Sequence, residues 1–316
     1  MLLNSYRNIQ IMEGVQYGQY TVPPVDKMVN FGVGQPSPEM LPLDKIQNSM
    51  KKHLEMTNPL LLQYGDIPGY KEFLKSLSNF LSDEYEDEVK TEQLLLTNGI
   101  TGAISLIFSL LDKDKTVVFV EDPTYFLMVS IIKDFSFKHI ETIQIKEDGI
   151  DTDELEEKIK DKKYESYNKV LYTIPVFHNP TGYSISHNKK EKLGKIADEN
   201  NLTILADEVY QMLYFEEKPP KPMCYYTDKA VSIGSFSKIL APSLRLGWIQ
   251  TNNKEYLNMI KSCGILDSSG CVNPICASIV HQIIESGDLR SNINDLKEIL
   301  KNRCYTLCSK LDDKLF

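Results

Sequence analysis

Arginine is scarce in this sequence. Its 35 basic residues include only four arginines, at positions 7, 245, 290 and 303. A guanidinium group binds a phosphate or a carboxylate through two parallel hydrogen bonds, which a lysine ammonium cannot do. Because no arginine lies between Arg7 and Arg245, a carboxylate on the side chain of a substrate would have to bind a lysine, for example Lys27.

Long apolar runs are also absent. No segment approaches the ~20 apolar residues that a helix needs to cross a bilayer, and the N-terminus lacks the basic-then-apolar order of a signal peptide. The formal net charge of −9 disfavours nucleic acid as a general partner. We therefore expect a cytoplasmic protein that binds a small molecule, with neither nucleic acid nor a membrane as its partner.

Metal-binding patterns are missing as well. The six cysteines form no C-x-x-C pair, and the five histidines form no H-x-x-x-H pair. Cys304 and Cys308 are one helical turn apart, and we expect them to pack as reduced thiols on the apolar face of a helix. The sequence therefore predicts no metal site.

What the sequence does contain, from residue 93 onward, is a regular alternation of short apolar segments and amphipathic segments. The apolar segments predict strands and the amphipathic ones predict helices. This order is typical of an α/β fold with a mostly parallel mixed sheet and helices on both of its faces. Ligands of such sheets bind beyond the carboxyl ends of the strands, so polar residues at those positions are the candidates for a site.

The stretch Ser235-Phe236-Ser237-Lys238 places a lysine beside two hydroxyls, and Arg245 follows it. A lysine that loses its proton in a partly dry pocket is an amine nucleophile that can form an imine with a carbonyl. With an arginine that grips phosphate, these residues suggest a site for a phosphorylated aldehyde, although Ser-x-Ser-Lys is also common in solvated loops. The apolar run Leu244–Ile249 predicts a buried strand, in which Arg245 would need an anionic partner such as phosphate.

The stretch Asn98-Gly99-Ile100-Thr101-Gly102 leads from a predicted strand into a predicted helix. Unpaired backbone amides at such a helix start bind phosphate. Together with Ser235, Ser237 and Arg245 they would form a phosphate cup. The alternative is an ordinary helix N-cap at Thr101.

Asp207 follows another predicted buried strand and opens the stretch Asp-Glu-Val-Tyr, which ends at Tyr210. A buried carboxylate needs a cationic or hydrogen-bond-donating partner, and a protonated pyridine nitrogen is one, because opposite charges favour each other's ionised forms. Tyr210 lies on the same face of a turn as Asp207 and could donate a hydrogen bond to the same ring. Asn179, in an Asn-Pro-Thr-Gly turn of a kind found in many loops, could be a second donor.

These motifs occur in a demanding order. The pattern Ser-x-Ser-Lys-x-x-x-Pro-x-x-Arg-x-Gly resembles the lysine signature of class I/II aminotransferases, which are pyridoxal-phosphate enzymes of fold type I. The resemblance extends from about Gly32 to Pro274 and looks closest to the branch that includes aminoadipate and kynurenine aminotransferases. It implies that pyridoxal 5'-phosphate is the cofactor, that Lys238 binds it as a Schiff base, and that the protein is a homodimer with shared active sites.

The resemblance also implies roles around the cofactor ring. Asp207 would pair with the ring nitrogen, and Tyr210 and Asn179 would donate to the phenolic oxygen. Tyr125 would stack on the ring, although the same residue could be a core aromatic at a helix start. The implied catalytic residues are Lys238, Asp207 and Tyr210.

Three further roles follow from the resemblance. Gly34 would present a backbone amide to the substrate, which Asn179 would also border. Tyr64 would reach the cofactor phosphate of the neighbouring subunit, although it could instead cap its own turn. The implied ligands of the phosphate within the same chain are Gly99, Thr101, Gly102, Ser235, Ser237 and Arg245.

The reaction that the resemblance implies is transamination from an L-amino acid to a 2-oxo acid, with the Lys238 amine carrying the proton at the substrate Cα. Aromatic residues in the N-terminal arm favour an aromatic or a long aliphatic, aminoadipate-like donor. We expect an N-terminal arm with part of a small domain at 1–44, a large cofactor-binding domain at 45–252, and the start of a small α/β domain at 253–316. Family members continue for several dozen residues and normally carry there an arginine that clamps the substrate carboxylate, so we expect a truncated product or a different mode of substrate binding.

Two alternatives share these motifs. One is a non-catalytic module that binds pyridoxal phosphate. Such modules occur in regulators, where a DNA-binding domain precedes the module, and the acidic N-terminal half of this sequence offers no such DNA-binding domain. The other is a different fold type I enzyme, such as a lyase or an aminocyclopropane carboxylate synthase, which would share Lys238 and Asp207.

Overall fold

The computed structural model describes residues 34–56, 59–270 and 272–311. The chain divides into two compact units, Met1–Leu41 and Pro42–Phe316. In the first unit the described residues include one short 3-10 helix, η1 (Pro38–Met40). All elements discussed below belong to the second unit, and the domain boundaries expected at residues 44 and 252 stay predictions.

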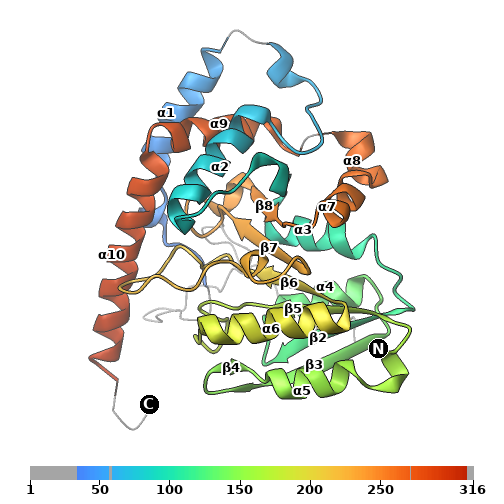
Figure 1. The fold of residues 1–316 in the computed structure, drawn as a ribbon. Coiled ribbons are helices and arrows are strands. Elements are labelled where there is room, and N and C mark those ends of the chain that lie inside the picture. The colour runs from blue at the N-terminus through green and yellow to red at the C-terminus, as the bar shows by residue number, and fades with distance from the viewer. Residues whose placement is uncertain (1–33, 57–58, 271, 312–316) are drawn as a thin grey trace, which may run out of the picture. The chain divides into compact units, whose positions relative to one another are not determined.

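The second unit is built on an eight-stranded sheet with the order β1-β8-β7-β6-β5-β2-β3-β4 (Figure 1). The strands β7, β6, β5, β2 and β3 run parallel to one another, whereas β1, β8 and β4 pair antiparallel with their neighbours. The mostly parallel mixed sheet expected from the sequence is therefore confirmed. The strands are β1 (Leu94–Thr97), β2 (Thr116–Asp122), β3 (His139–Lys146), β4 (Gly149–Ile150), β5 (Asn168–Thr173), β6 (Leu202–Asp207), β7 (Ala230–Ser235) and β8 (Gly247–Gln250).

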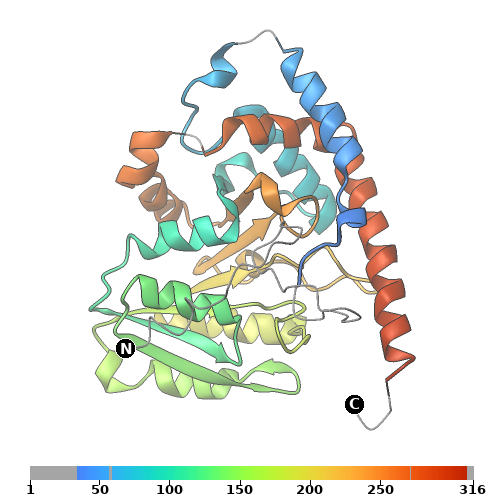
Figure 2. The same cartoon turned by 180° about the vertical axis from the view of Figure 1, so that it is seen from behind.

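Helices cover both faces of this sheet because the central strands are apolar on both sides. In β2, Val118 and Val120 pack into one core cluster, and the alternate residues Val117 and Phe119 pack into another. Figure 1 shows α5 and α6 on one face, and Figure 2 shows α4 on the other. The helices that contribute to these two clusters are α3 (Gly99–Phe108), α4 (Phe126–Asp134), α7 (Lys254–Lys261) and α8 (Gly264–Ser269) in the first, and α5 (Thr152–Ile159) and α6 (His187–Asn200) in the second.

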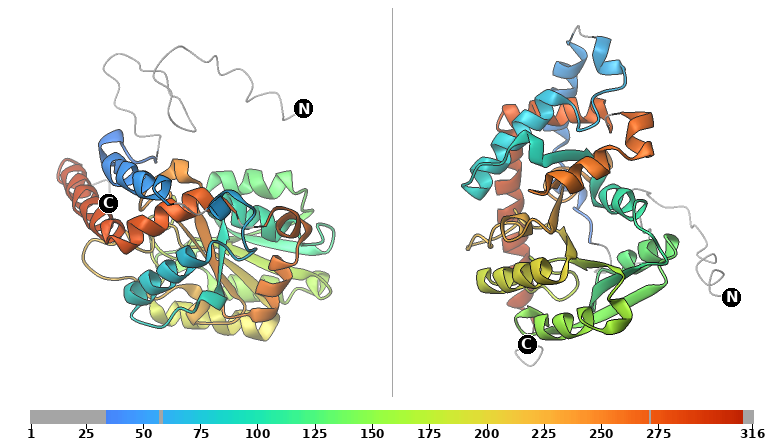
Figure 3. Two further views of the ribbon diagram at one scale, coloured as in Figure 1. Left: turned by 90° about the horizontal axis from the view of Figure 1, so that it is seen from above. Right: turned by 45° about the vertical axis from the view of Figure 1, so that its right-hand side comes forward.

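A third core cluster joins α2, α9 and α10 to the loop that follows β7. Phe73 of α2 and Val280 of α9 are buried in it, together with Phe236 and Ile239, which flank the predicted site lysine. Asn292 of α10 donates a hydrogen bond from Nδ2 to the carbonyl oxygen of Ile239 at 2.8 Å. This cluster therefore anchors the lysine loop on both sides. Figure 3 shows its helices from above; they are α2 (Lys71–Tyr85), α9 (Pro274–Glu285) and α10 (Asp288–Cys308), and α1 (Leu43–Leu54) packs against α9.

Two expectations from the sequence are wrong. The strand expected from Leu244 begins only at Gly247, because Leu244 ends a 3-10 helix, η6 (Pro242–Leu244), and Arg245 adopts a left-handed conformation with φ of 49°. Cys304 and Cys308 are exposed rather than packed against a core, because the last turns of α10 project beyond the residues that bury its first half. No described helix combines the length and the apolar content that a membrane span requires.

Candidate active site

Strand pairing brings the two halves of the expected phosphate site together. Thr97, the last residue of β1, and Ser235, the last residue of β7, both pair with Gly247 of β8. Because β1 and β7 are each antiparallel to β8, they run in the same direction and end at the same edge of the sheet. The start of α3, which follows β1, therefore lies beside the loop that follows β7.

Two glycines make this approach possible. A Cβ on Gly247 would lie 2.8 Å from the Gly99 Cα, so only a glycine lets these two backbones come so close. Gly99 itself has a φ of 70°, and a Cβ on it would lie 3.1 Å from Nη2 of Arg245. The Arg245 side chain therefore lies directly against the first residue of α3.

The first turn of α3 is open to an anion. Thr101 is not the N-cap, as one alternative supposed, because α3 begins at Gly99 and its N-cap is Asn98. Asn98 makes no side-chain capping hydrogen bond in the structure, so the first-turn amides of α3 are not used by a cap and carry the positive end of the helix dipole. Thr101 is exposed, whereas a Cβ on Gly102 would lie 2.8 Å from the Asn98 Cβ, which fixes the tightness of this turn.

The serines of the lysine loop face each other next to this helix start. Ser235 Oγ lies 3.0 Å from Ser237 Oγ and also accepts a hydrogen bond from the Ser237 amide at 3.1 Å. Arg245 is exposed rather than buried, which corrects the expectation that it lies inside a strand, and its Nη1 donates to the Pro242 carbonyl oxygen at 3.1 Å. The guanidinium, two hydroxyls and a helix N-terminus form a donor set suited to phosphate.

Asp207 is the last residue of β6 and is 5% exposed. Its Oδ2 accepts a hydrogen bond from the Tyr172 hydroxyl at 2.8 Å, and its Oδ1 accepts one from the Val209 amide at 3.3 Å. The pKa of Asp207 is raised to about 6, chiefly by burial and to a lesser extent by the charge of Glu208, while the two hydrogen bonds and the positive charge of Lys238 act in the opposite direction. Neutral donors thus hold the carboxylate in place, and the positive charge of Lys238 stabilises its ionised form.

Lys238 lies in the turn after β7 and is half-buried. Burial lowers the pKa of its amine, and the negative charge of Asp207 partly restores that pKa. A lower pKa increases the fraction of neutral amine near neutral pH, which is the nucleophilic and basic form. The expected proximity of Lys238 to Asp207 is therefore present.

Tyr210 and Asn179 also meet. The two side chains are hydrogen-bonded, which lowers the pKa of Tyr210, whereas burial, the larger effect, and the charge of Asp207 raise it. Asn179 precedes Pro180 through a cis peptide bond. The loop from β5 and the turn after β6 thus place both expected donors near Asp207.

Sequence reasoning missed the residues that hold this loop. His178 is buried, with Nδ1 2.8 Å from Thr181 Oγ1 and Nε2 3.1 Å from Oε2 of Glu121. Glu121, in β2, also accepts a hydrogen bond from the Thr173 hydroxyl at 2.8 Å. Tyr172 was missed too, although a hydroxyl inside the apolar run of β5 signals that a buried partner must exist.

The expected roles of three further residues stay predictions. Tyr125 is the half-buried N-cap residue of α4 and packs partly against the core, which agrees with both interpretations given above. Tyr64 is 82% exposed, and its expected contact with a neighbouring subunit stays a prediction. Gly34 belongs to the first unit, so its expected contact with the substrate stays a prediction as well.

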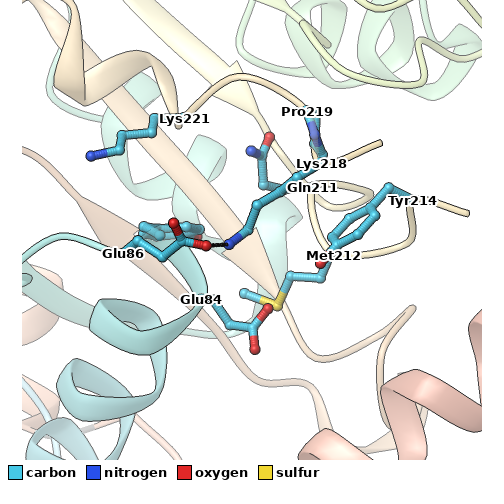
Figure 4. A pocket seen from close by; sticks show the side chains of 9 residues that line it. Glu84, Glu86, Gln211, Met212, Tyr214, Lys218, Pro219 and Lys221 are labelled. Atoms are coloured by element: carbon cyan, nitrogen blue, oxygen red, sulfur yellow. Dashed lines mark hydrogen bonds and ion pairs between the residues drawn. The ribbon is translucent and has the colours of Figure 1, made fainter. Parts of the chain in front are cut away.

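A small pocket of about 120 Å³ lies outside this site, and Figure 4 shows its lining side chains. Glu86 and Lys218 form an ion pair of 2.6 Å at its rim. None of the expected site residues lines it. Its lining residues are Glu84, Tyr85, Glu86, Gln211, Met212, Tyr214, Lys218, Pro219 and Lys221.

The donor set matches pyridoxal phosphate at each of its polar ends. The α3 N-terminus, the serines and Arg245 fit the phosphate, and the half-buried Lys238 amine fits the aldehyde. The buried Asp207 carboxylate fits a protonated ring nitrogen, and the hydrogen-bonded pair of Tyr210 and Asn179 fits the phenolic oxygen.

Comparison with known proteins agrees with this chemistry. The model of the family "Aminotransferase class I and II" matches residues 26–316. Over 291 residues the chain is 27% identical to aromatic-amino-acid aminotransferase 1 of Thermococcus litoralis, covering 90% of this chain and 69% of that protein. It is also 27% identical over 296 residues to the HTH-type transcriptional regulator YdfD of Bacillus subtilis, covering 91% of this chain and 58% of the regulator.

A solved structure is similar as well. The kynurenine aminotransferase of Pyrococcus horikoshii superposes with a TM-score of 0.77 at 25% identity, covering 86% of this chain and 67% of that one. The family and the cofactor predicted from the motifs are thereby confirmed. The chain belongs to the class I and II aminotransferases, and it is an enzyme of that class whose cofactor is pyridoxal 5'-phosphate.

Proposed function

We propose that this enzyme moves the amino group of an aromatic or long aliphatic, aminoadipate-like L-amino acid to a 2-oxo acid, with Lys238 as the residue that binds the cofactor. The observation that carries the proposal is the convergence of Lys238 and Asp207, in which each charge shifts the pKa of the other group. The aromatic-amino-acid and kynurenine aminotransferases among its relatives support the substrate class.

Pyridoxal phosphate, when bound, supplies an electron-poor ring that stabilises negative charge at the substrate Cα. Asp207 would pair with the ring nitrogen and keep it protonated, and Tyr210 and Asn179 would donate hydrogen bonds to the phenolic oxygen. Arg245 and the start of α3 would hold the phosphate and so orient the cofactor toward these side chains.

Lys238 carries the proton. Its lowered pKa raises the fraction of neutral amine, which can accept a proton from the substrate Cα and deliver it to the aldehyde carbon of the cofactor. General acid–base work of this kind contributes about 10²–10⁴ to a rate. Phe236 and Ile239 anchor the Lys238 loop in the core, so the backbone from which the amine extends is held in place.

A homodimer is part of the proposal. Large apolar side chains near Tyr64 in the sequence are exposed: Leu54 is 81% and Leu62 is 76% exposed. Exposed apolar side chains that form one continuous patch favour an interface, and there Tyr64 would reach the cofactor phosphate of the neighbouring subunit. We also propose the cytoplasm as its location.

The test is an absorption spectrum of purified protein with added pyridoxal phosphate, for wild type, Lys238→Ala and Lys261→Ala. Lys261, in α7, is a matched control because burial lowers the pKa of its amine too. We expect the absorption band of an imine, distinct from that of the free aldehyde, in wild type and in Lys261→Ala, and none in Lys238→Ala. An imine band that persists in Lys238→Ala would reject Lys238 as the binding residue.

The same samples then receive amino acids one at a time. We expect aromatic and long aliphatic amino acids to change the band and to yield a new amino acid once a 2-oxo acid is added. A band that no amino acid changes would instead indicate a binding module. A band that changes without amino transfer to any 2-oxo acid would indicate another fold type I chemistry, such as that of a lyase.

A further inference from the structure

Tyr172 contacts Asp207 through its side chain, and the reaction described above does not use it. It lies in β5, the strand next to β6, and none of its surface is exposed. Its hydroxyl donates to Oδ2 of Asp207 at 2.8 Å. The contact joins two fully packed strands at positions separated by 35 residues in the chain, so it depends on the register of the sheet.

The register explains why the hydroxyl reaches Asp207. Tyr172 pairs with Leu205, and Asp207 lies two residues farther along β6, on the same face of the sheet. A tyrosine is long enough to span that diagonal, whereas the neighbouring Thr173 points to the other face and donates to Glu121 instead. The hydroxyl at this position is therefore aimed at Asp207 and at no other carboxylate within hydrogen-bond distance in the described structure.

We infer that Tyr172 is a positioning residue for the cofactor: it fixes the orientation of the Asp207 carboxylate and favours its ionised form. A single donor held in a packed strand restricts rotation of the carboxylate, since Oδ2 is bound to Tyr172 and Oδ1 faces the Val209 amide. A phenol that donates to a carboxylate stabilises the charged state more than the neutral one. This inference rests on the proposed role of Asp207 in binding the ring nitrogen.

Other charged groups around this pair act on it but do not replace the hydroxyl. Lys238 stabilises the negative charge on Asp207, and the adjacent Glu208 opposes it. Burial and the charges of Asp207 and Glu121 raise the pKa of Tyr172 well above its usual value, with a smaller contribution from Tyr125. Tyr172 therefore keeps its proton throughout the stable pH range and remains a donor.

The experiment compares wild type with Tyr172→Phe, which removes only the hydroxyl, as proteins freed of pyridoxal phosphate. Asp207 is largely protonated at pH 5 and largely ionised at pH 8, because its pKa is about 6. We expect the Tm of Tyr172→Phe to lie about 3–6 °C below that of wild type at pH 8 and within about 2 °C of it at pH 5. In an Asp207→Asn background this dependence on pH should disappear.

Tyr164→Phe is the matched control. The Tyr164 hydroxyl is equally a donor to a carboxylate, at 2.6 Å from Oε1 of Glu141, but that carboxylate lies outside the site and its pKa is lowered. Any change in Tm in this variant should be the same at pH 5 and pH 8, since Glu141 stays ionised throughout. An equal loss of Tm at both pH values in Tyr172→Phe would show that the hydroxyl is an ordinary core donor and would overturn the inference.

A second readout is the affinity for pyridoxal phosphate, measured by absorption titration at pH 8. We expect the dissociation constant of Tyr172→Phe to rise about tenfold and that of Tyr164→Phe to stay within about twofold. An unchanged constant in Tyr172→Phe would reject the role in cofactor binding. If wild type binds no pyridoxal phosphate, the proposed function fails, whereas the Tm comparison still decides whether Tyr172 controls the charge of Asp207.

Discussion

Asp207 and Glu208 are adjacent in the chain, equally buried and yet surrounded differently. Glu208 accepts a hydrogen bond from the Met223 amide at 2.8 Å, and its Oε1 lies 3.7 Å from Nζ of the fully buried Lys190. Asp207 faces the other side of the sheet, where Tyr172 donates to it. The Glu208 carboxylate lies near a buried lysine of its own, whereas the Asp207 carboxylate is held by neutral donors beside the site lysine.

The difference separates a structural charge from a functional one. Burial raises the pKa of both carboxylates, but in Glu208 the charge of Lys190 is the largest compensating effect, whereas in Asp207 it is a neutral hydroxyl. A buried carboxylate that is matched internally contributes to the fold, while one left undercompensated retains the capacity to pair with a cationic ligand.

The largest effect is expected from Lys190→Met, which leaves Glu208 buried without its cation. Breaking a buried ion pair by removing one partner costs about 3–5 kcal/mol of the free energy of unfolding. Urea denaturation at pH 8 measures it. Lys189→Met is the control on the same helix: its partner Asp148 is 74% exposed, so the loss should stay below about 1 kcal/mol. Equal losses of unfolding free energy in both variants would show that the pair of Lys190 and Glu208 does not stabilise the fold more than an exposed ion pair does.

Asp207→Asn should raise the free energy of unfolding, whereas Lys190→Met lowers it. The folded-state pKa of Asp207, about 6, lies above its ordinary value, so its ionisation opposes folding, and this penalty grows as the pH rises from about 4 to about 6. Replacing it by asparagine removes the penalty, which at pH 8 is on the order of 2–3 kcal/mol, and leaves stability at pH 4 nearly unchanged.

The same variant should lose most of its amino-transfer activity, because a neutral amide does not keep the ring nitrogen protonated. Urea denaturation of the cofactor-free protein at pH 4 and pH 8, together with amino-transfer rates, gives both readouts. An Asp207→Asn protein that is less stable than wild type at pH 8 would mean that Asp207, like Glu208, serves the fold.

Much of this site could be predicted from local sequence. Asp207 ends a strand, and Lys238 and Asn179 follow strand ends; the direction of parallel strands brings such positions to one edge of a sheet. The helix and strand alternation was predicted correctly for the same reason, since apolar periodicity is a local property of the chain. The fold class follows from these features, and the resemblance of the motifs to class I/II aminotransferases implies the cofactor.

The supporting residues could not be predicted in this way. Tyr172 contacts Asp207, and His178 contacts Glu121, because of the register of neighbouring strands, and no local sequence pattern specifies that register. Arg245 was placed in a strand because apolar residues flank it, but Pro242 starts a 3-10 turn and the left-handed backbone at Arg245 turns its side chain toward Gly99. Long-range contacts override the local pattern at these positions.

A smaller effect is expected from Gly99→Ala. Alanine at a φ of 70° costs about 1–2 kcal/mol, and its Cβ would press on the Arg245 guanidinium. Gly287→Ala is a matched control, since φ there is 80° and a Cβ would meet no atom within 4 Å. Both variants should lose similar stability in urea, but only Gly99→Ala should bind pyridoxal phosphate about tenfold more weakly. Weaker binding in both would mean that strain alone, and not contact with Arg245, governs cofactor affinity.

The smallest effect is expected from a substitution in the pocket of Figure 4, which, like Glu208, we assign to the fold and not to the reaction. Glu86 pairs with Lys218 at 2.6 Å, but its side chain is 78% exposed, so solvent screens the pair. Glu86→Gln should change the Tm by no more than about 1 °C and leave both cofactor affinity and amino-transfer rate within about twofold of wild type. The loop that forms this pocket continues from Tyr210, and a larger loss of rate in Glu86→Gln would therefore show that the pocket and the site are coupled through that loop.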